Sequence, residues 1–105
     1  LNALGGTVEQ AVKRRGFHVI RELAGHGVGR KVHERPEVLN VYRAADRTRL
    51  TEGLVLALEP MVSLRPGRVQ TRADGWTIGM PRGNLTAHFE HTVVVTDGRP
   101  LVLTA

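Results

Sequence analysis

One histidine in this sequence is placed to hold a ligand rather than to pack a core. His26 lies in Gly25-His26-Gly27-Val28-Gly29-Arg30, with a glycine on each side, and a second imidazole follows at His33. Glycine adopts backbone conformations closed to other residues and lets another group come close. The motif therefore predicts an imidazole nitrogen that is held toward a metal, a ligand or a substrate.

Two glutamates interrupt apolar stretches later in the sequence. Glu59 separates two apolar runs, and Glu90 lies just before the apolar run Thr92–Val95. A carboxylate within a buried strand is costly unless it is paired, hydrogen-bonded or bound to a metal. Either glutamate alone could equally be a surface position on an edge strand. Two of them, in a chain that also carries His26, favour a shared site.

The set His26, Glu59 and Glu90 offers one imidazole and two carboxylates. Such ligands suit divalent cations such as Mn, Fe, Co or Zn rather than Cu(I). Glutamates can also bridge two cations, as they do in many hydrolases with two-metal sites. The HExxH pattern of zinc proteases is absent, because no second histidine follows His33-Glu34 at that spacing.

The remaining histidines are interpreted as residues that do not bind the metal. His88 and His91 flank Glu90, and the alternation of side chains along a strand is taken to point both away from its face. They are therefore predicted to be supporting or opposite-face groups. His18, inside the first predicted strand, is interpreted as a structural or surface residue.

The composition indicates one globular domain and excludes several kinds of chemistry. The 105 residues are 41% hydrophobic and 24% charged, which is ordinary for a soluble protein. No apolar run approaches the roughly 20 residues that span a bilayer, and no signal peptide is visible. The absence of cysteine excludes disulfides, thiolate-bound zinc and a cysteine nucleophile. A cytoplasmic location without membrane contact is the expectation.

The positive charge of the chain does not point to a specific nucleic-acid partner. The formal charge is +5, which can draw a protein toward polyanions. The arginines are scattered, however, and only one Trp, one Tyr and two Phe could stack on bases. No nucleic-acid-binding module is recognisable. A generally basic, solvated surface is the prediction.

The residue pattern predicts one helix followed by several strands. Thr7 is the expected N-cap of a helix over Val8–Arg15 that stops at Gly16. Runs rich in apolar and β-branched residues predict the strands Phe17–Leu23, Leu54–Leu58, Met61–Leu64, Trp76–Ile78, Ala87–Thr96 and Leu101–Leu103. The predicted non-regular segments are the glycine-rich loop, an irregular or extended stretch His33–Leu39 and a surface connection Asn40–Glu52. The expected class is α+β, with a mainly antiparallel sheet and one or two helices.

Four separate motifs resemble those of the bacterial type I methionine aminopeptidases. In order they are Gly25–Arg30 with His33-Glu34, Leu58-Glu59-Pro60-Met61, Asp74-Gly75-Trp76-Thr77 and Phe89–Thr96. The resemblance runs from about Gly16 to Ala105 and implies a curved sheet that forms half of a pita-bread fold. Prolidases of the same fold share the histidine motif and the Glu-Pro pair but usually end differently. The stretch Glu90-His91-Thr92 therefore favours the methionine enzymes.

The resemblance implies a site for two divalent metal ions (Mn, Fe, Co or Zn). His26 and Glu59 would bind one of them, and Glu90 would bridge both. His33 would contact the substrate carbonyl, Glu59 would also shuttle protons, and Trp76 would line the pocket for the substrate's first residue. The implied reaction is the hydrolytic removal of the N-terminal methionine from nascent proteins and peptides.

The resemblance also indicates how much of the site this sequence carries. The family supplies two aspartate ligands and another catalytic histidine from a region before the histidine motif, whereas Asp46, Asp74 and Asp97 all follow His26. Residues 1–105 are therefore predicted to be the C-terminal portion of a methionine aminopeptidase-like catalytic domain, with little activity alone. A pocket position that is often aromatic in the family is Val32 here.

Two other interpretations stay open. Some pita-bread proteins are non-catalytic modules that associate with ribosomes or nucleic acid, and the basic charge is compatible with such a role. Those relatives usually lose the metal ligands, whereas His26, Glu59, Glu90 and His33 are present here. Another metallo-exopeptidase of the same fold, such as a prolidase, is the remaining alternative.

Overall fold

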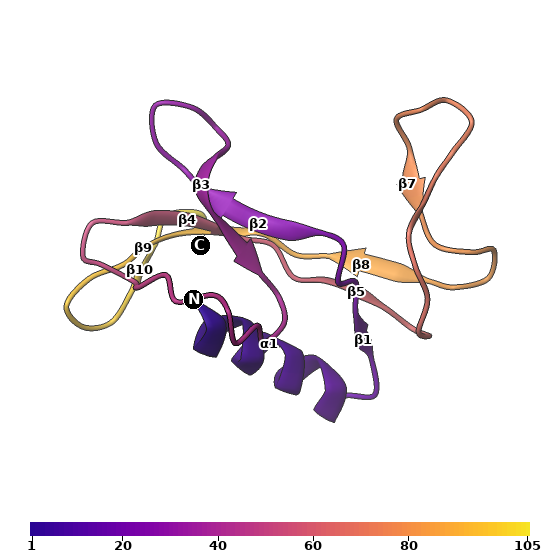
Figure 1. Cartoon of the computed structure of the whole chain (residues 1–105), viewed down its shortest axis with the longest axis horizontal. Coiled ribbons are helices and arrows are strands. Elements are labelled where there is room, and N and C mark those ends of the chain that lie inside the picture. Colours follow the sequence, from indigo (N-terminus) through magenta and orange to yellow (C-terminus); the bar gives the residue numbers. More distant parts are fainter.

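The computed structural model describes all 105 residues, Leu1 to Ala105, as one helix and ten short strands. The elements are α1 (Asn2–Arg14), β1 (His18–Val19), β2 (Ala24–Gly27), β3 (Glu34–Leu39), β4 (Val55–Leu58), β5 (Met61–Ser63), β6 (Gln70–Thr71), β7 (Ile78–Gly79), β8 (Thr86–His88), β9 (His91–Val94) and β10 (Leu101–Val102). They form a five-stranded sheet in the order β10-β9-β4-β2-β3, a three-stranded sheet β1-β5-β8 and the pair β6-β7 (Figure 1). Every pairing is antiparallel, which confirms the predicted α+β class.

Two segments of the chain run through both larger sheets and join them. β4 pairs with β9, and β5 pairs with β8. Both segments break at the same level, between Leu58 and Met61 on one and between His88 and His91 on the other, which the registers place opposite each other. The predicted strand Ala87–Thr96 is therefore two strands. Glu59 and Glu90 both lie at this joint between the sheets.

The first half of the glycine-rich motif is a strand rather than the predicted loop, whereas Val28, Gly29 and Arg30 are non-regular. β2 lies inside the five-stranded sheet, with His26 opposite Ala57 of β4 and opposite Glu37 of β3. A Cβ atom at Gly25 would overlap the carbonyl oxygen of Ala57. Glycine is therefore required here by the close approach of β2 and β4, which the sequence pattern suggested only as flexibility. The predicted strand Phe17–Leu23 shrinks to β1, and the stretch expected to be irregular or extended becomes β3.

The helix begins earlier than predicted. It starts at Asn2, so Thr7 is inside it, and the Thr7 hydroxyl donates a hydrogen bond of 2.9 Å to the carbonyl of Ala3. The pair Gly5-Gly6 hid this start, since glycine disfavours helices. A Cβ atom at Gly5 would overlap the carbonyl oxygen of Val41 and stand 2.7 Å from that of Leu39. The helix thus uses glycine to pack directly on backbone, and it ends before Gly16 as predicted.

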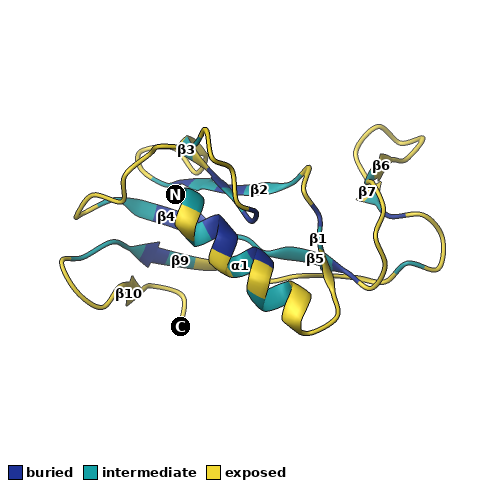
Figure 2. Ribbon diagram, turned by 60° about the horizontal axis from the view of Figure 1, so that its bottom comes forward, coloured by how far each residue is buried: buried dark blue, intermediate teal, exposed yellow.

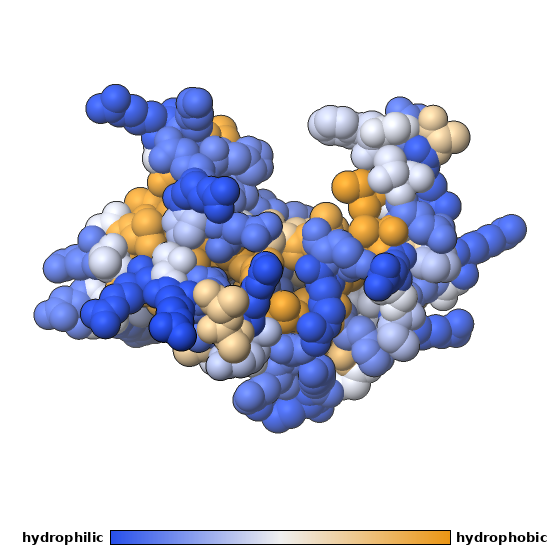
Figure 3. Space-filling view, in the orientation of Figure 1, coloured by the Kyte–Doolittle hydropathy of each residue, from blue (hydrophilic) through white to orange (hydrophobic).

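The hydrophobic core is small and lies where α1 crosses the five-stranded sheet (Figure 2). Its buried members are Leu1, Val38, Leu56 and Val93. Only 15 of the 105 residues are buried, so large apolar side chains such as Leu85 and Phe89 stay open to solvent. Figure 3 shows apolar residues exposed among charged ones on one face of the molecule. No helix in the structure has the length and apolar character needed to cross a membrane.

Glu9 is a buried charge that ties α1 to two other segments. It is only 8% exposed. Its carboxylate accepts a hydrogen bond of 3.1 Å from the Tyr42 N–H, lies 2.9 Å from the Lys13 ammonium and pairs with the Arg21 guanidinium. The Lys13 hydrogen bond, followed by the Tyr42 N–H and the two positive charges, lowers the pKa of Glu9 below its ordinary 4.5 and outweighs the effect of burial.

The substitution Glu9→Gln should lower the free energy of unfolding by about 1–3 kcal/mol, because it leaves charged and polar partners unsatisfied. The carboxylate contributes its full stabilisation above pH 4.5, and that contribution is lost as the pH falls through the lowered pKa of the folded state. Urea unfolding of the wild type and the variant at several pH values measures this. The stability difference should shrink toward acid pH. A difference that is the same at every pH would contradict the assignment, and exposed Glu52→Gln serves as the control.

Candidate metal centre

The candidate site faces away from the helix. The loop between β2 and β3 and the β6–β7 hairpin both project from the side of the sheets opposite α1 (Figure 1). The space-filling view shows the surface hollowed between these two projections (Figure 3). Two of the four motifs on which the resemblance rests belong to these projections or to the strands beneath them. They are the histidine motif and the motif that contains Trp76.

Glu59 is the centre of the arrangement. Its side chain is 14% exposed, and each carboxylate oxygen faces an imidazole. Oε1 lies 3.1 Å from His26 Nε2, and Oε2 lies 3.1 Å from His88 Nε2. The backbone of Glu59 is fixed separately, because the buried Asn40 side chain donates a hydrogen bond of 2.7 Å to its carbonyl oxygen.

Glu90 brings a second carboxylate to the same place. Ligand atoms of Glu59, His88 and Glu90 all lie within 4.8 Å of one another. The two glutamates come from breaks in neighbouring segments, so their side chains meet without either carboxylate lying in a packed strand. The structure therefore brings both His26 and Glu90 close to one residue, Glu59.

The orientation of His26 fits a metal ligand. Its Nδ1 lies 2.8 Å from the Gly27 carbonyl oxygen, to which an Nδ1–H would donate. That hydrogen bond leaves the lone pair of Nε2 directed at Glu59, and such a backbone partner is usual for histidines that bind metals. A neutral imidazole has one N–H, so it can donate to the Gly27 carbonyl oxygen or to Glu59 Oε1 but not to both. A cation between Nε2 and Glu59 Oε1 would be bound by both atoms.

The spacing of the donors also fits a divalent cation. Two ligands that each lie about 2.1 Å from one cation are roughly 3.0–3.4 Å apart for octahedral or tetrahedral angles. Both imidazole nitrogens lie 3.1 Å from a Glu59 oxygen. The residues present therefore match the size and the chemistry of a metal centre.

His33 lies beside His26. The two ring centroids are 4.1 Å apart, with the planes inclined by 44°. The loop that carries His33 is held by Glu34, whose carboxylate accepts a 2.7 Å hydrogen bond from the Lys31 N–H. Both histidines open onto a hollow of about 500 Å³. His33 and His26 therefore lie side by side at this hollow, which Glu59, His88 and Glu90 do not line.

Trp76 lies apart from these residues, in the turn between β6 and β7. It is 86% exposed. The turn is shaped by Asp74, which accepts hydrogen bonds from the Thr77 hydroxyl and from the N–H groups of Thr77 and Trp76. The Thr77 hydroxyl, followed by these N–H groups, lowers the pKa of Asp74. The hairpin thus presents Trp76 to solvent on the projection that faces the histidine loop.

Two residues of the site were not recognised from the sequence. The interpretation of His88 as pointing away from Glu90 is wrong: residues two apart in an extended segment share a face, and His88 Nε2 contacts Glu59. His91 does point elsewhere, since its Nδ1 contacts the carbonyl and hydroxyl oxygens of Thr104. Asn40 was assigned to a surface connection but is 4% exposed. No pattern in the sequence marks Asn40, because its burial depends on contact with a distant segment.

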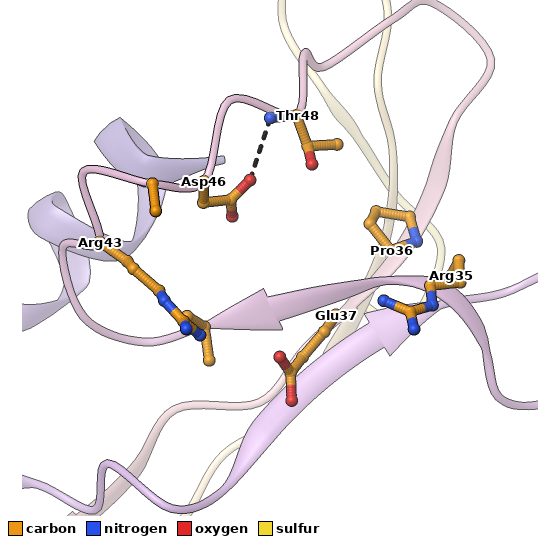
Figure 4. A pocket seen from close by; sticks show the side chains of 8 residues that line it. Arg35, Pro36, Glu37, Arg43, Asp46 and Thr48 are labelled. Atoms are coloured by element: carbon orange, nitrogen blue, oxygen red, sulfur yellow. Dashed lines mark hydrogen bonds between the residues drawn. The ribbon is translucent and has the colours of Figure 1, made fainter.

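A second hollow lies at the outer side of β3 and is not part of this centre (Figure 4). It has a volume of about 430 Å³, and Arg35, Glu37, Arg43 and Asp46 are among the residues that line it. Asp46 accepts a 3.0 Å hydrogen bond from the Thr48 N–H, which is the main cause of its lowered pKa. The Asp46 carboxylate therefore makes its hydrogen bond within its own loop.

The chain is similar to known metallopeptidases. Residues 1–97 match metallopeptidase family M24. The chain is 45% identical over 104 residues to a methionine aminopeptidase of Clostridium perfringens, covering 99% of this chain and 42% of that protein. It is 48% identical over 97 residues to one of Borreliella burgdorferi, covering 91% and 39%.

Solved structures show the same relation. A crystal structure of methionine aminopeptidase from Thermotoga maritima matches with a TM-score of 0.88 and 41% identity, covering 95% of this chain and 40% of that one. The structure from Rickettsia prowazekii matches with a TM-score of 0.88 and 31% identity over 96% of this chain. The chain thus spans about 40% of the length of the relatives it matches. Since the family match covers residues 1–97 and the fold agrees with these structures, this chain belongs to metallopeptidase family M24.

Proposed function

We propose that residues 1–105 are the C-terminal portion of a methionine aminopeptidase-like catalytic domain that removes N-terminal methionine from nascent proteins and peptides. The observation that carries the proposal is the position of Glu59, with an imidazole 3.1 Å from each carboxylate oxygen and Glu90 close by. The similarity to methionine aminopeptidases supports the choice of substrate. Nascent chains carry this methionine in the cytoplasm, which is the compartment we propose.

In this proposal His26, Glu59 and Glu90 hold two divalent metal ions, with Mn, Fe, Co and Zn as the candidate metals. Bound metals of this kind polarise the scissile carbonyl and make a water molecule more acidic. The Gly27 carbonyl keeps the His26 ring in the orientation that ligation requires. Glu59, the more enclosed of the two carboxylates, accepts a proton from the attacking water and passes it to the leaving amine.

His33 and Trp76 act on the substrate rather than on the metals. His33, stacked obliquely beside His26, donates a hydrogen bond to the carbonyl oxygen of the scissile peptide as negative charge develops on it. Trp76 offers an exposed apolar ring on the opposing hairpin for the methionine side chain.

A chimera tests this proposal directly. This chain would replace the matching 42% of the Clostridium perfringens protein, and methionine release from a Met-Ala-Ser peptide would be measured. We expect turnover, and we expect His33→Ala in the chimera to lower kcat by about 10²–10³-fold, as loss of an oxyanion donor does. The 105-residue chain alone should release little methionine. Robust turnover by that chain, or a chimera that hydrolyses only other peptides, would overturn the assignment.

A further inference from the structure

His88 occupies a position in the centre that no predicted ligand fills. It ends β8, two residues before Glu90, and its Nε2 lies 3.1 Å from Glu59 Oε2. The other Glu59 oxygen faces His26 at the same distance. Glu59 is therefore bracketed by two imidazoles from strands that are far apart in the sequence.

The neighbours of His88 leave its ring free for this site. The one polar contact of the ring is with Glu59, whereas His91, the next histidine along, is occupied by Thr104. The His88 side chain is 48% exposed, so a cation could reach Nε2 from solvent. The ligand atoms of Glu59, His88 and Glu90 are close enough to share one ion.

We propose that His88 is itself a ligand of a divalent cation, together with Glu59 and Glu90. This inference rests on the proposed metal-dependent function and adds an imidazole to its site. The two carboxylates and the His88 imidazole form a donor set that suits Zn²⁺, Co²⁺ or Fe²⁺ better than Mg²⁺ or Ca²⁺, which prefer oxygen ligands. His88 thus adds a nitrogen ligand to the two carboxylates of this site.

The substitution His88→Gln separates ligation from mere positioning. A glutamine amide can still donate a hydrogen bond to Glu59, but its nitrogen does not bind metals. We expect His88→Gln to weaken Co²⁺ binding by about 10–100-fold in isothermal titration, with His91→Gln unchanged as the matched control. Pulsed electron paramagnetic resonance of the Cu²⁺-loaded chain should count one bound imidazole fewer in His88→Gln than in the wild type, whereas His91→Gln should leave the count unchanged.

The outcomes distinguish this inference from the function on which it rests. The role of His88 alone would be overturned if His88→Gln left both Co²⁺ binding and the imidazole count unchanged while His26→Gln and Glu90→Gln weakened binding. No Co²⁺ binding by the wild-type chain would overturn both. Should His88→Gln not fold, nuclear magnetic resonance of the wild type replaces it. Diamagnetic Zn²⁺ should then shift the ring protons of His88 and leave those of His91 near their original positions; unshifted His88 protons would overturn the proposal.

Discussion

Replacing Glu59 with glutamine should weaken Co²⁺ binding by more than about 100-fold. This exceeds the loss expected when a residue that only hydrogen-bonds to a metal ligand is removed. Glu59 faces two imidazoles, one on each oxygen, and lies near Glu90. Glutamine has the same shape but carries no charge, so the imidazoles lose the anion that each of them shares with a cation. Isothermal titration of the 105-residue chain measures the change.

The fold should survive this substitution, which makes the result interpretable. The contact that fixes this part of the backbone runs from Asn40 to the carbonyl oxygen of residue 59, and it does not involve the side chain. The free energy of unfolding should therefore change by less than about 1 kcal/mol. Glu52→Gln, in an exposed turn, is the control and should bind Co²⁺ as the wild type does. Equal affinity of Glu59→Gln and wild type would refute the metal centre.

Gly25→Ala should lower the free energy of unfolding by about 3 kcal/mol or more, because the added methyl group would overlap the Ala57 carbonyl oxygen. It would also press within 3.2 Å of the Glu59 backbone nitrogen. Because these atoms belong to the backbone of β4 and of the residue that follows it, β2 could accommodate the methyl group only by moving away from β4. Small domains have only about 5–15 kcal/mol of stability, so the substitution should remove roughly a fifth or more of it.

Urea unfolding measures this loss, and Gly98→Ala provides the control. Gly98 has nothing within 4 Å of the added Cβ position, so alanine there should change the stability by less than about 0.5 kcal/mol. Any Gly25→Ala protein that remains folded should bind Co²⁺ more weakly, since His26 moves with β2. Wild-type stability for Gly25→Ala would mean that β2 and β4 do not approach as closely as described.

Much of the fold could be predicted because the turns and apolar runs are local signals. The apolar runs at β4, β5 and β10 lie where the sequence places them. The start of α1 and the nature of β2 could not be predicted in this way. At both places glycine serves close contact with a distant backbone, Val41 for Gly5 and Ala57 for Gly25, and such contacts are invisible to local pattern.

The site was partly predictable for the same reason. Glu59 and Glu90 stand out because a carboxylate next to an apolar run needs a partner, and the structure does bring them together. Asn40 and His88 do not stand out, because their roles depend on tertiary placement. Asn40 acts through a backbone carbonyl 19 residues away, and His88 through a side chain 29 residues away.

The joint at which both long segments break has a mechanical consequence. The five-stranded and three-stranded sheets are connected through β4–β5 and β8–β9, and the donors Glu59 and Glu90 lie one on each connection. An ion bound by both glutamates would cross-link the two connections at this joint. Loading the centre would then stiffen the whole domain, so that the supply of metal in the cell would govern its rigidity as well as its chemistry.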